Sequence, residues 1–131
     1  YDHELNKKTP LIIWTKDKSL QKVFKGQVNY TMGMYNVSST ILNMYGIYNK
    51  YTMGEDIFSV KDDNFVVFPN GNILTNKMYY NNSTEEYKAL TNSEITEDYI
   101  TSLKELGEKR LEVSNSIIVY NLLENKNMNG E

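Results

Sequence analysis

Apolar residues recur every three or four positions in two segments of the chain, and they alternate or run together in the segments between. The longer helical pattern opens at Thr96, a good N-cap, with Glu97 and Asp98 in the first turn where acidic groups complement the helix dipole. It predicts an amphipathic helix to about Glu124, with Gly107 as a candidate kink. Its apolar positions are Tyr99, Ile100, Leu103, Leu106, Leu111, Val113, Ile117, Ile118, Leu122 and Leu123.

A shorter helix is predicted from about Val37 to Tyr45. Asn36, Ser38 or Ser39 can cap its start by accepting a backbone N–H bond, and Gly46 stands where a left-handed glycine ends many helices. Four apolar residues fall on one face of this helix. They are Val37, Ile41, Met44 and Tyr45.

Between the two helices the period changes to two, which is typical of strands. Phe65–Phe68 is followed by a turn at Pro69–Asn72, because Asn-Gly tolerates the positive φ that tight turns require. Further short extended segments follow, separated by turn residues, and together they predict a small antiparallel meander. The later segments are Ile73–Thr75, Lys77–Tyr80 and Glu86–Leu90.

Leu11–Trp14, directly after Pro10, is apolar at every position and rich in β-branched residues. Such a run predicts a strand buried on both faces, as in the middle of an α/β sheet. We interpret Lys16–Lys25 as a lysine-rich surface loop with one turn of helix. If the strand belongs to a larger sheet, this chain alone exposes an apolar edge, covered by self-association or by folding back of the lysine-rich loop.

These elements predict an α+β fold: a small antiparallel sheet of three or four strands, a short helix and a long C-terminal helix. The 131 residues form a single domain of ordinary size. We divide it into a strand and helix in residues 1–50, the meander in 51–92 and the long helix in 93–125.

Composition excludes several kinds of chemistry. The chain has no cysteine, so disulfides and thiolate metal sites are excluded. It has one histidine, His3, so His-cluster metal sites and Ser-His-Asp catalysis are not expected. No apolar run approaches the ~20 residues that a membrane helix needs. Residues 1–50 carry seven lysines and three acids, a net of +4, whereas 51–131 carry seven basic and fourteen acidic residues, a net of −7. The pI of the chain is near 5.2 and its lysines are scattered, so we do not expect nucleic-acid binding.

Three acidic pairs are candidates for cation binding, but each lies in a turn-like or loop context that favours a solvated pair. The turn at 69–72 lacks the glycines and lysine of a phosphate-binding loop. We interpret most tyrosines as packed surfaces rather than a glycan or glycerol-phosphate groove. Five methionines are interpreted as core residues rather than a metal site: Met32, Met34, Met44, Met53 and Met78. The acidic pairs are Glu55-Asp56, Asp62-Asp63 and Glu85-Glu86; the tyrosines are Tyr30, Tyr35, Tyr45, Tyr48, Tyr51, Tyr79 and Tyr80.

Four segments, in order, resemble one superfamily. Thr9–Trp14 (TPLIIW) resembles a late strand of the sulfatase/alkaline-phosphatase superfamily, and Met34–Ile47 (MYNVSSTILNMYGI) its strand-to-helix segment "(V/Y)DVxPTLxxLxGI". Gly54–Ser59 (GEDIFS) resembles the following "G-x-D-(I/L)-F". Phe65–Thr75 (FVVFPNGNILT) is similar to the "VVFxNGxxxT" hairpin of the lipoteichoic acid synthase branch, the membrane-anchored phosphoglycerol transferases. The resemblance covers roughly residues 5–80, and it departs from the family at Asn36, usually Asp, and Ser39, usually Pro.

This resemblance implies the C-terminal part of an extracellular catalytic domain. The family's active site is a nucleophilic threonine with Glu, Asp and His ligands to one divalent metal, usually manganese, and most of it lies upstream. Asp2-His3 imitates the Asp-His ligand pair, but Pro10 follows His3 by only seven residues and no glycine precedes Asp2. We therefore expect no catalytic residue, metal ligand or cofactor in this chain, and its substrate-binding residues stay unassigned.

The resemblance also implies partners and a location. The partner is the rest of the parent catalytic domain, self-association through the exposed strand is a second expectation, and the membrane is reached only through upstream helices. The parent would lie on the extracellular face of a bacterial membrane and transfer glycerol phosphate from phosphatidylglycerol to a growing polymer. Two alternatives stay open: a stand-alone glycan- or protein-binding module, or the C-terminal part of a sulfatase or phosphodiesterase.

Overall fold

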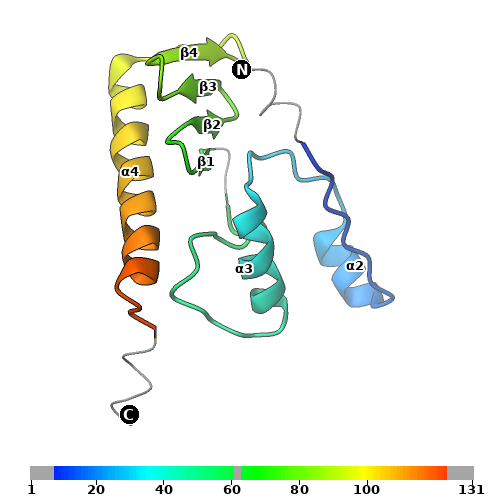
Figure 1. Cartoon of the computed structure of the whole chain (residues 1–131). Coiled ribbons are helices and arrows are strands. Elements are labelled where there is room, and N and C mark those ends of the chain that lie inside the picture. The colour runs from blue at the N-terminus through cyan, green and yellow to red at the C-terminus, as the bar shows by residue number, and fades with distance from the viewer. Residues whose placement is uncertain (1–7, 61–62, 124–131) are drawn as a thin grey trace.

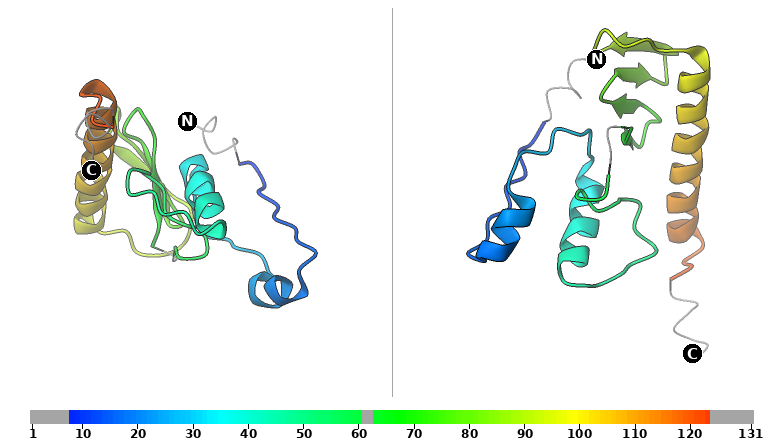
Figure 2. Two further views of the ribbon diagram at one scale, coloured as in Figure 1. Left: turned by 90° about the horizontal axis from the view of Figure 1, so that it is seen from below. Right: turned by 180° about the vertical axis from the view of Figure 1, so that it is seen from behind.

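The computed structural model describes residues 8–60 and 63–123 (Figure 1). In these ranges the chain forms three helices and four short strands, so the predicted α+β class is confirmed. Figure 2 shows the sheet between the long C-terminal helix on one side and the earlier helices on the other. The elements are α2 (Lys18–Phe24), α3 (Met34–Met44), β1 (Phe65–Val67), β2 (Ile73–Thr75), β3 (Met78–Asn81), β4 (Glu86–Ala89) and α4 (Glu97–Val119).

The four strands pair in the order β1-β2-β3-β4, and every neighbouring pair is antiparallel. This confirms the meander that the alternating pattern predicts. In the first turn Gly71 has φ of 83° and its N–H donates to the carbonyl of Phe68 at 2.9 Å, as expected for an Asn-Gly turn. The sheet is therefore a local structure in which each strand pairs with the next along the chain.

Helix α4 starts where the sequence predicts. The hydroxyl of Thr96 accepts from the N–H of Tyr99 at 3.2 Å and caps the first turn. Ile100 and Leu103 of α4 enter the main hydrophobic cluster together with residues from the first three strands. The strand residues of that cluster are Phe65, Val67, Ile73, Met78 and Tyr80.

Gly107 permits close packing of α4 on the sheet, rather than marking a kink. The helix continues unbroken from Glu97 to Val119. A Cβ at position 107 would lie 3.3 Å from Val67 Cγ2 and 3.4 Å from Ile73 Cδ1, so the absence of a side chain lets the helix approach the strands. The pattern locates this glycine in the helix but does not reveal its packing role.

Helix α3 begins at Met34, three residues before the predicted start, so the three capping candidates all lie inside it. Its N-cap is Gly33, and the side chain of Asn36 accepts from the Gly33 N–H at 2.9 Å. At the other end Gly46 has φ of 69°, and the N–H of Ile47 donates to the carbonyl of Leu42 at 2.9 Å. The predicted glycine stop is thus confirmed.

The predicted strand at Leu11–Trp14 is wrong for this chain. These residues belong to no sheet, and Ile12 and Trp14 are 85% and 73% exposed. The reason is physical: a strand apolar on both faces needs neighbours on either edge and cover on either face, and the described residues supply neither. The lysine-rich segment after it forms α2, capped by Asp17, and does not fold back over Ile12 and Trp14.

Candidate functional site

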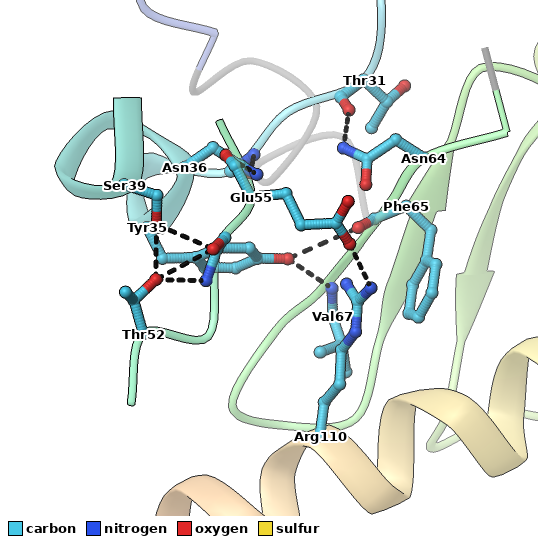
Figure 3. A network of polar contacts seen from close by, with 12 residues as sticks. Thr31, Tyr35, Asn36, Ser39, Thr52, Glu55, Asn64, Phe65, Val67 and Arg110 are labelled. Carbon is cyan, nitrogen blue, oxygen red and sulfur yellow. Dashed lines mark hydrogen bonds and ion pairs between the residues drawn. The ribbon is translucent and has the colours of Figure 1, made fainter. Parts of the chain in front are cut away.

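Polar side chains gather where α3, residues 52–57, β1 and α4 meet, and we call this the polar junction (Figure 3). Asn36 lies at its centre and is only 1% exposed. Its side-chain amide donates to the carbonyl of Glu55 at 3.0 Å while its oxygen accepts from Gly33. One side chain therefore caps α3 and ties it to the loop that follows.

Thr40, one turn further along α3, repeats this arrangement and is fully buried. Its hydroxyl donates to the carbonyl of Asn36 at 2.7 Å and accepts from the N–H of Ile57 at 2.9 Å. Thr40 and Asn36 together fasten both ends of the segment 55–57 to the helix. Buried polar groups that are fully paired in this way fix a single arrangement of backbone.

Ser39 and Thr52 extend the junction toward the start of the loop. Their hydroxyls bond to each other, and the Ser39 hydroxyl donates to the carbonyl of Gly54 at 2.7 Å. Gly54 lies so close to α3 that a Cβ there would stand 2.7 Å from the backbone nitrogen of Asn36. Only glycine allows this contact between the two backbones.

Tyr35 connects α3 with the free edge of the sheet. Its hydroxyl accepts from the N–H of Val67 at 3.3 Å and donates to the carbonyl of Phe65 at 3.5 Å, as the dashed lines in Figure 3 show. Burial raises the pKa of the Tyr35 phenol above its usual value, and the Val67 N–H and Arg110 oppose this. The phenol occupies the place that another strand would take.

Arg110 of α4 closes the junction from the opposite side. Its guanidinium is 3.3 Å from the Glu55 carboxylate and lies over the ring of Phe65, 4.3 Å from the ring centroid. The same side chain thus makes a partly exposed ion pair and a cation–π contact. A hollow of about 360 Å³ lies beside this ion pair, between α4 and the segment before β1. Glu55, Asp63 and Arg110 are among its lining residues.

Glu55, Asp56 and Glu85, three of the acidic residues named from the sequence, contact separate partners. Glu55 faces Arg110, whereas Asp56 bonds to the side chains of Asn43 and Ser59. Glu85 sits in the β3–β4 turn with φ of 56° and pairs with Lys104 at 3.6 Å. Asp63 is exposed, while Asp2, His3 and Asp62 lie outside the described residues. Among the residues that the structure describes, no three acidic or histidine side chains are grouped to hold a metal ion.

The tyrosines named from the sequence are divided among three roles. Tyr79 and Tyr80 are buried in the sheet, as the packing interpretation predicts, and Tyr35 is in the polar junction. The interpretation as packed residues is wrong for the other four, which are exposed: Tyr30, Tyr45, Tyr48 and Tyr51. The described tyrosines therefore form no common groove.

The outer face of α3 and Leu11–Trp14 border an apolar hollow of about 390 Å³. The pattern correctly assigns Val37, Ile41, Met44 and Tyr45 to one face, but the face turned to the rest of the chain is the polar one carrying Asn36 and Thr40. Sequence reasoning missed this inversion and the polar junction with it. The interpretation of Met34 and Met44 as core residues is wrong for the same reason, because both are exposed. The available signal was that Ser39 and Thr40 follow Asn36 by three and four residues, which places polar side chains on one face of the helix.

The chain is similar to a lipoteichoic acid synthase. It is 32% identical over 127 residues to lipoteichoic acid synthase 1 of Bacillus subtilis (strain 168), and the match covers 94% of this chain. The chain spans 19% of the length of that relative.

Because it covers 94% of the chain, the match includes most of the residues on which the resemblance to the synthase branch rests. No protein-family model matches the chain, and no solved structure matches it. Within residues 8–60 and 63–123, no helix has the length and apolar character required to cross a bilayer. The similarity is to part of a synthase, and the described residues of this chain carry the polar junction and an apolar hollow.

Proposed function

We propose that the chain is the C-terminal part of the extracellular catalytic domain of a lipoteichoic acid synthase-like phosphoglycerol transferase. The observation that carries this proposal is the similarity to lipoteichoic acid synthase 1 over 94% of the chain, against 19% of the relative. The parent protein transfers glycerol phosphate from phosphatidylglycerol onto a growing cell-envelope polymer through a phosphothreonine intermediate. It is anchored in a bacterial membrane by upstream helices, with this part on the extracellular side.

In this proposal the 131 residues act as scaffold. The polar junction holds α3, the loop 52–57, the sheet edge and α4 in one arrangement, and every contact that builds it is structural. In this proposal the divalent metal, manganese in this class, is held by the rest of the parent domain. Threonine nucleophile and metal ligands both lie upstream, and this chain alone is catalytically silent.

A chimera tests the proposal. The 131 residues replace the matching segment of the Bacillus subtilis synthase, and glycerol-phosphate transfer from phosphatidylglycerol is measured in membranes. We expect transfer to be retained, and to be lost when an unrelated α+β segment of equal length is inserted instead. A chimera that inserts and folds like the parent synthase but transfers no glycerol phosphate would overturn the proposal.

A stand-alone binding module is the second candidate, and the exposed Tyr45 and Tyr48 favour it, because aromatic faces stack on sugars. The 131-residue chain would then bind cell-wall glycans by itself, with loss of binding in Tyr45→Ala and Tyr48→Ala. Binding of this kind together with an inactive chimera would select the module. Hydrolysis of sulfate esters or other phosphodiesters by the parent would instead select a sulfatase or phosphodiesterase.

A further inference from the structure

Helix α2 carries charge of a single sign on its surface. The lysines are scattered along the sequence, but the helix brings Lys18 and Lys22 onto one face, since residues four apart are neighbours on a helix. Lys25 is the C-cap residue at the end of that face, and Lys16 precedes the N-cap residue. All four side chains are exposed. We call these four residues the lysine stripe.

No described acidic side chain forms an ion pair with the lysine stripe. Lys18 contacts instead the side-chain oxygen of Gln21, at 3.4 Å. The single acidic residue in residues 8–50 is Asp17, whose carboxylate accepts from the N–H of Ser19 at 2.7 Å and caps α2. Residues 8–50 therefore carry six lysines and one aspartate, a net charge of +5.

The opposite charge lies on the other side of the molecule. Residues 51–131 have a net charge of −7, and α4 alone carries five acidic and three basic residues, the mixed pattern of an ordinary exposed helix. Figures 1 and 2 show α2 and α4 on opposite sides of the sheet. A negatively charged surface would therefore attract the chain with α2 turned toward it.

We propose that the lysine stripe docks on the surface of a membrane that contains phosphatidylglycerol. The inference rests on the proposed function for the choice of lipid, because phosphatidylglycerol is both the anionic lipid and the donor of glycerol phosphate in that function. It adds a second, reversible contact with the bilayer to the upstream helices that anchor the parent protein.

The chemistry of the lysine stripe favours a lipid surface over a single bound ligand or a nucleic acid. A lysine ammonium is a compact point charge without the fork by which arginine holds one phosphate, and no lysine lines the two hollows described above. Separate point charges suit a surface of many mobile headgroups. Nucleic-acid-binding domains have a high pI, whereas that of this chain is near 5.2.

The expected strength of the contact suits an anchored protein. Each lysine close to an anionic surface raises the affinity by roughly fivefold, and salt weakens the attraction. Four lysines give weak binding for a free chain. Upstream helices would hold the chain at the membrane, where a high effective concentration makes a weak contact sufficient to turn α2 toward the bilayer.

The experiment measures binding of the 131-residue chain to vesicles of phosphatidylcholine with and without phosphatidylglycerol, by co-sedimentation at low and high salt. Lys18→Gln/Lys22→Gln removes two charges from the lysine stripe. Lys88→Gln/Lys109→Gln is the matched control, because both lysines are exposed and lie on β4 and α4. Thermal melts show that both double variants are folded.

We expect phosphatidylglycerol to strengthen binding of the wild type by about tenfold or more at low salt, and high salt to abolish the gain. The double variant in the lysine stripe should lose affinity by roughly twentyfold, and the control by less than about twofold. Equal binding to the two kinds of vesicle would overturn the inference, because exposed apolar residues rather than charge would then hold the chain. So would equal losses in the two double variants.

Soluble polyanions identify the other possible occupants. Tighter binding to a glycerol-phosphate polymer or to duplex DNA than to the vesicles, at equal phosphate concentration, would assign the lysine stripe to a polyanion in solution and reject the membrane.

These results separate the inference from the proposed function. Vesicle binding through the lysine stripe, in a chain whose longer gene product transfers no glycerol phosphate, would keep the docking surface and reject the transferase. Transfer of glycerol phosphate by the longer protein, with no binding of the 131 residues to phosphatidylglycerol vesicles, would reject the docking surface alone.

Discussion

The hydroxyl of Tyr35 accepts a hydrogen bond from the backbone N–H of Val67 at 3.3 Å and thereby closes the outer edge of β1. An open edge strand is a template for unwanted pairing, and proteins cover such edges in several ways. Here a single phenol from α3 does so, and also fixes the distance between helix and sheet. This contact connects the polar junction to the sheet.

Removing the phenol oxygen should destabilise the chain. Tyr35→Phe leaves the Val67 N–H and the Phe65 carbonyl without this partner, at a cost of about 1–2 kcal/mol. Tyr45→Phe is the matched control, because Tyr45 is the C-cap residue of the same helix and its side chain is exposed. Urea unfolding should show the difference; equal stability of the two variants would mean that the edge contact contributes nothing.

Stability should also depend on pH through Tyr35. Burial raises the pKa of its phenol in the folded chain above the ordinary value of 10.0, so the folded state retains a proton that the unfolded state releases. The contribution is complete below pH 10.0 and is lost as the pH rises through the folded value. Wild type should therefore lose more stability than Tyr35→Phe between neutral pH and strongly alkaline pH, and parallel losses would contradict this.

Two glycine-to-alanine changes should have unequal effects. At Gly54 a methyl group meets backbone atoms of α3, which move only with the helix, so Gly54→Ala should cost about 2–3 kcal/mol or more. At Gly107 it meets side-chain ends of Val67 and Ile73, and alanine gains about 1 kcal/mol of helix propensity in compensation. Thermal melts should show a large loss for Gly54→Ala and a small change for Gly107→Ala.

Arg110 should matter more than its ion-pair partner. Glu55→Ala removes a partly exposed salt bridge worth about 0–1 kcal/mol, whereas Arg110→Ala also removes the stacking on Phe65. A double-mutant cycle should give a coupling energy below about 1 kcal/mol, with Arg110→Ala the more destabilising single change. A larger effect of Glu55→Ala would show that the carboxylate has a role besides the ion pair.

Manganese should not stabilise the 131-residue chain. A site for the folded state alone, with ligand at a hundred times Kd, would add about 2.7 kcal/mol and raise Tm by several degrees. The prediction is no shift with millimolar manganese, because the described residues group no three suitable ligands and Asp2-His3 has the wrong spacing. A shift lost in Asp2→Ala or His3→Ala would make Asp2-His3 a ligand pair.

The elements that the sequence predicts well are those with local causes. The Asn70-Gly71 turn, the Thr96 cap and the glycine after α3 act through neighbouring residues, and the structure has all three. The meander is also local, because each strand pairs with the next one in the chain.

The predictions that fail depend on distant or missing partners. Leu11–Trp14 has the composition of an interior strand, but strand structure needs neighbouring strands that the described residues do not contain. The polar junction depends on contacts across 13 to 55 residues of sequence, as between Ser39 and Thr52 or Glu55 and Arg110, which no periodicity reveals. Glu55, Asp56 and Glu85 contact separate partners, which are Arg110, Asn43 and Lys104.

The most direct test of the central claim is glycerol-phosphate transfer by the longer gene product that contains these residues. The purified protein, with manganese, is incubated with phosphatidylglycerol carrying a labelled headgroup, and labelled polymer and diacylglycerol are measured. We expect both products, and neither from the 131-residue chain under the same conditions. A folded longer protein that leaves phosphatidylglycerol intact would contradict the account. So would an open reading frame that encodes these 131 residues and nothing else.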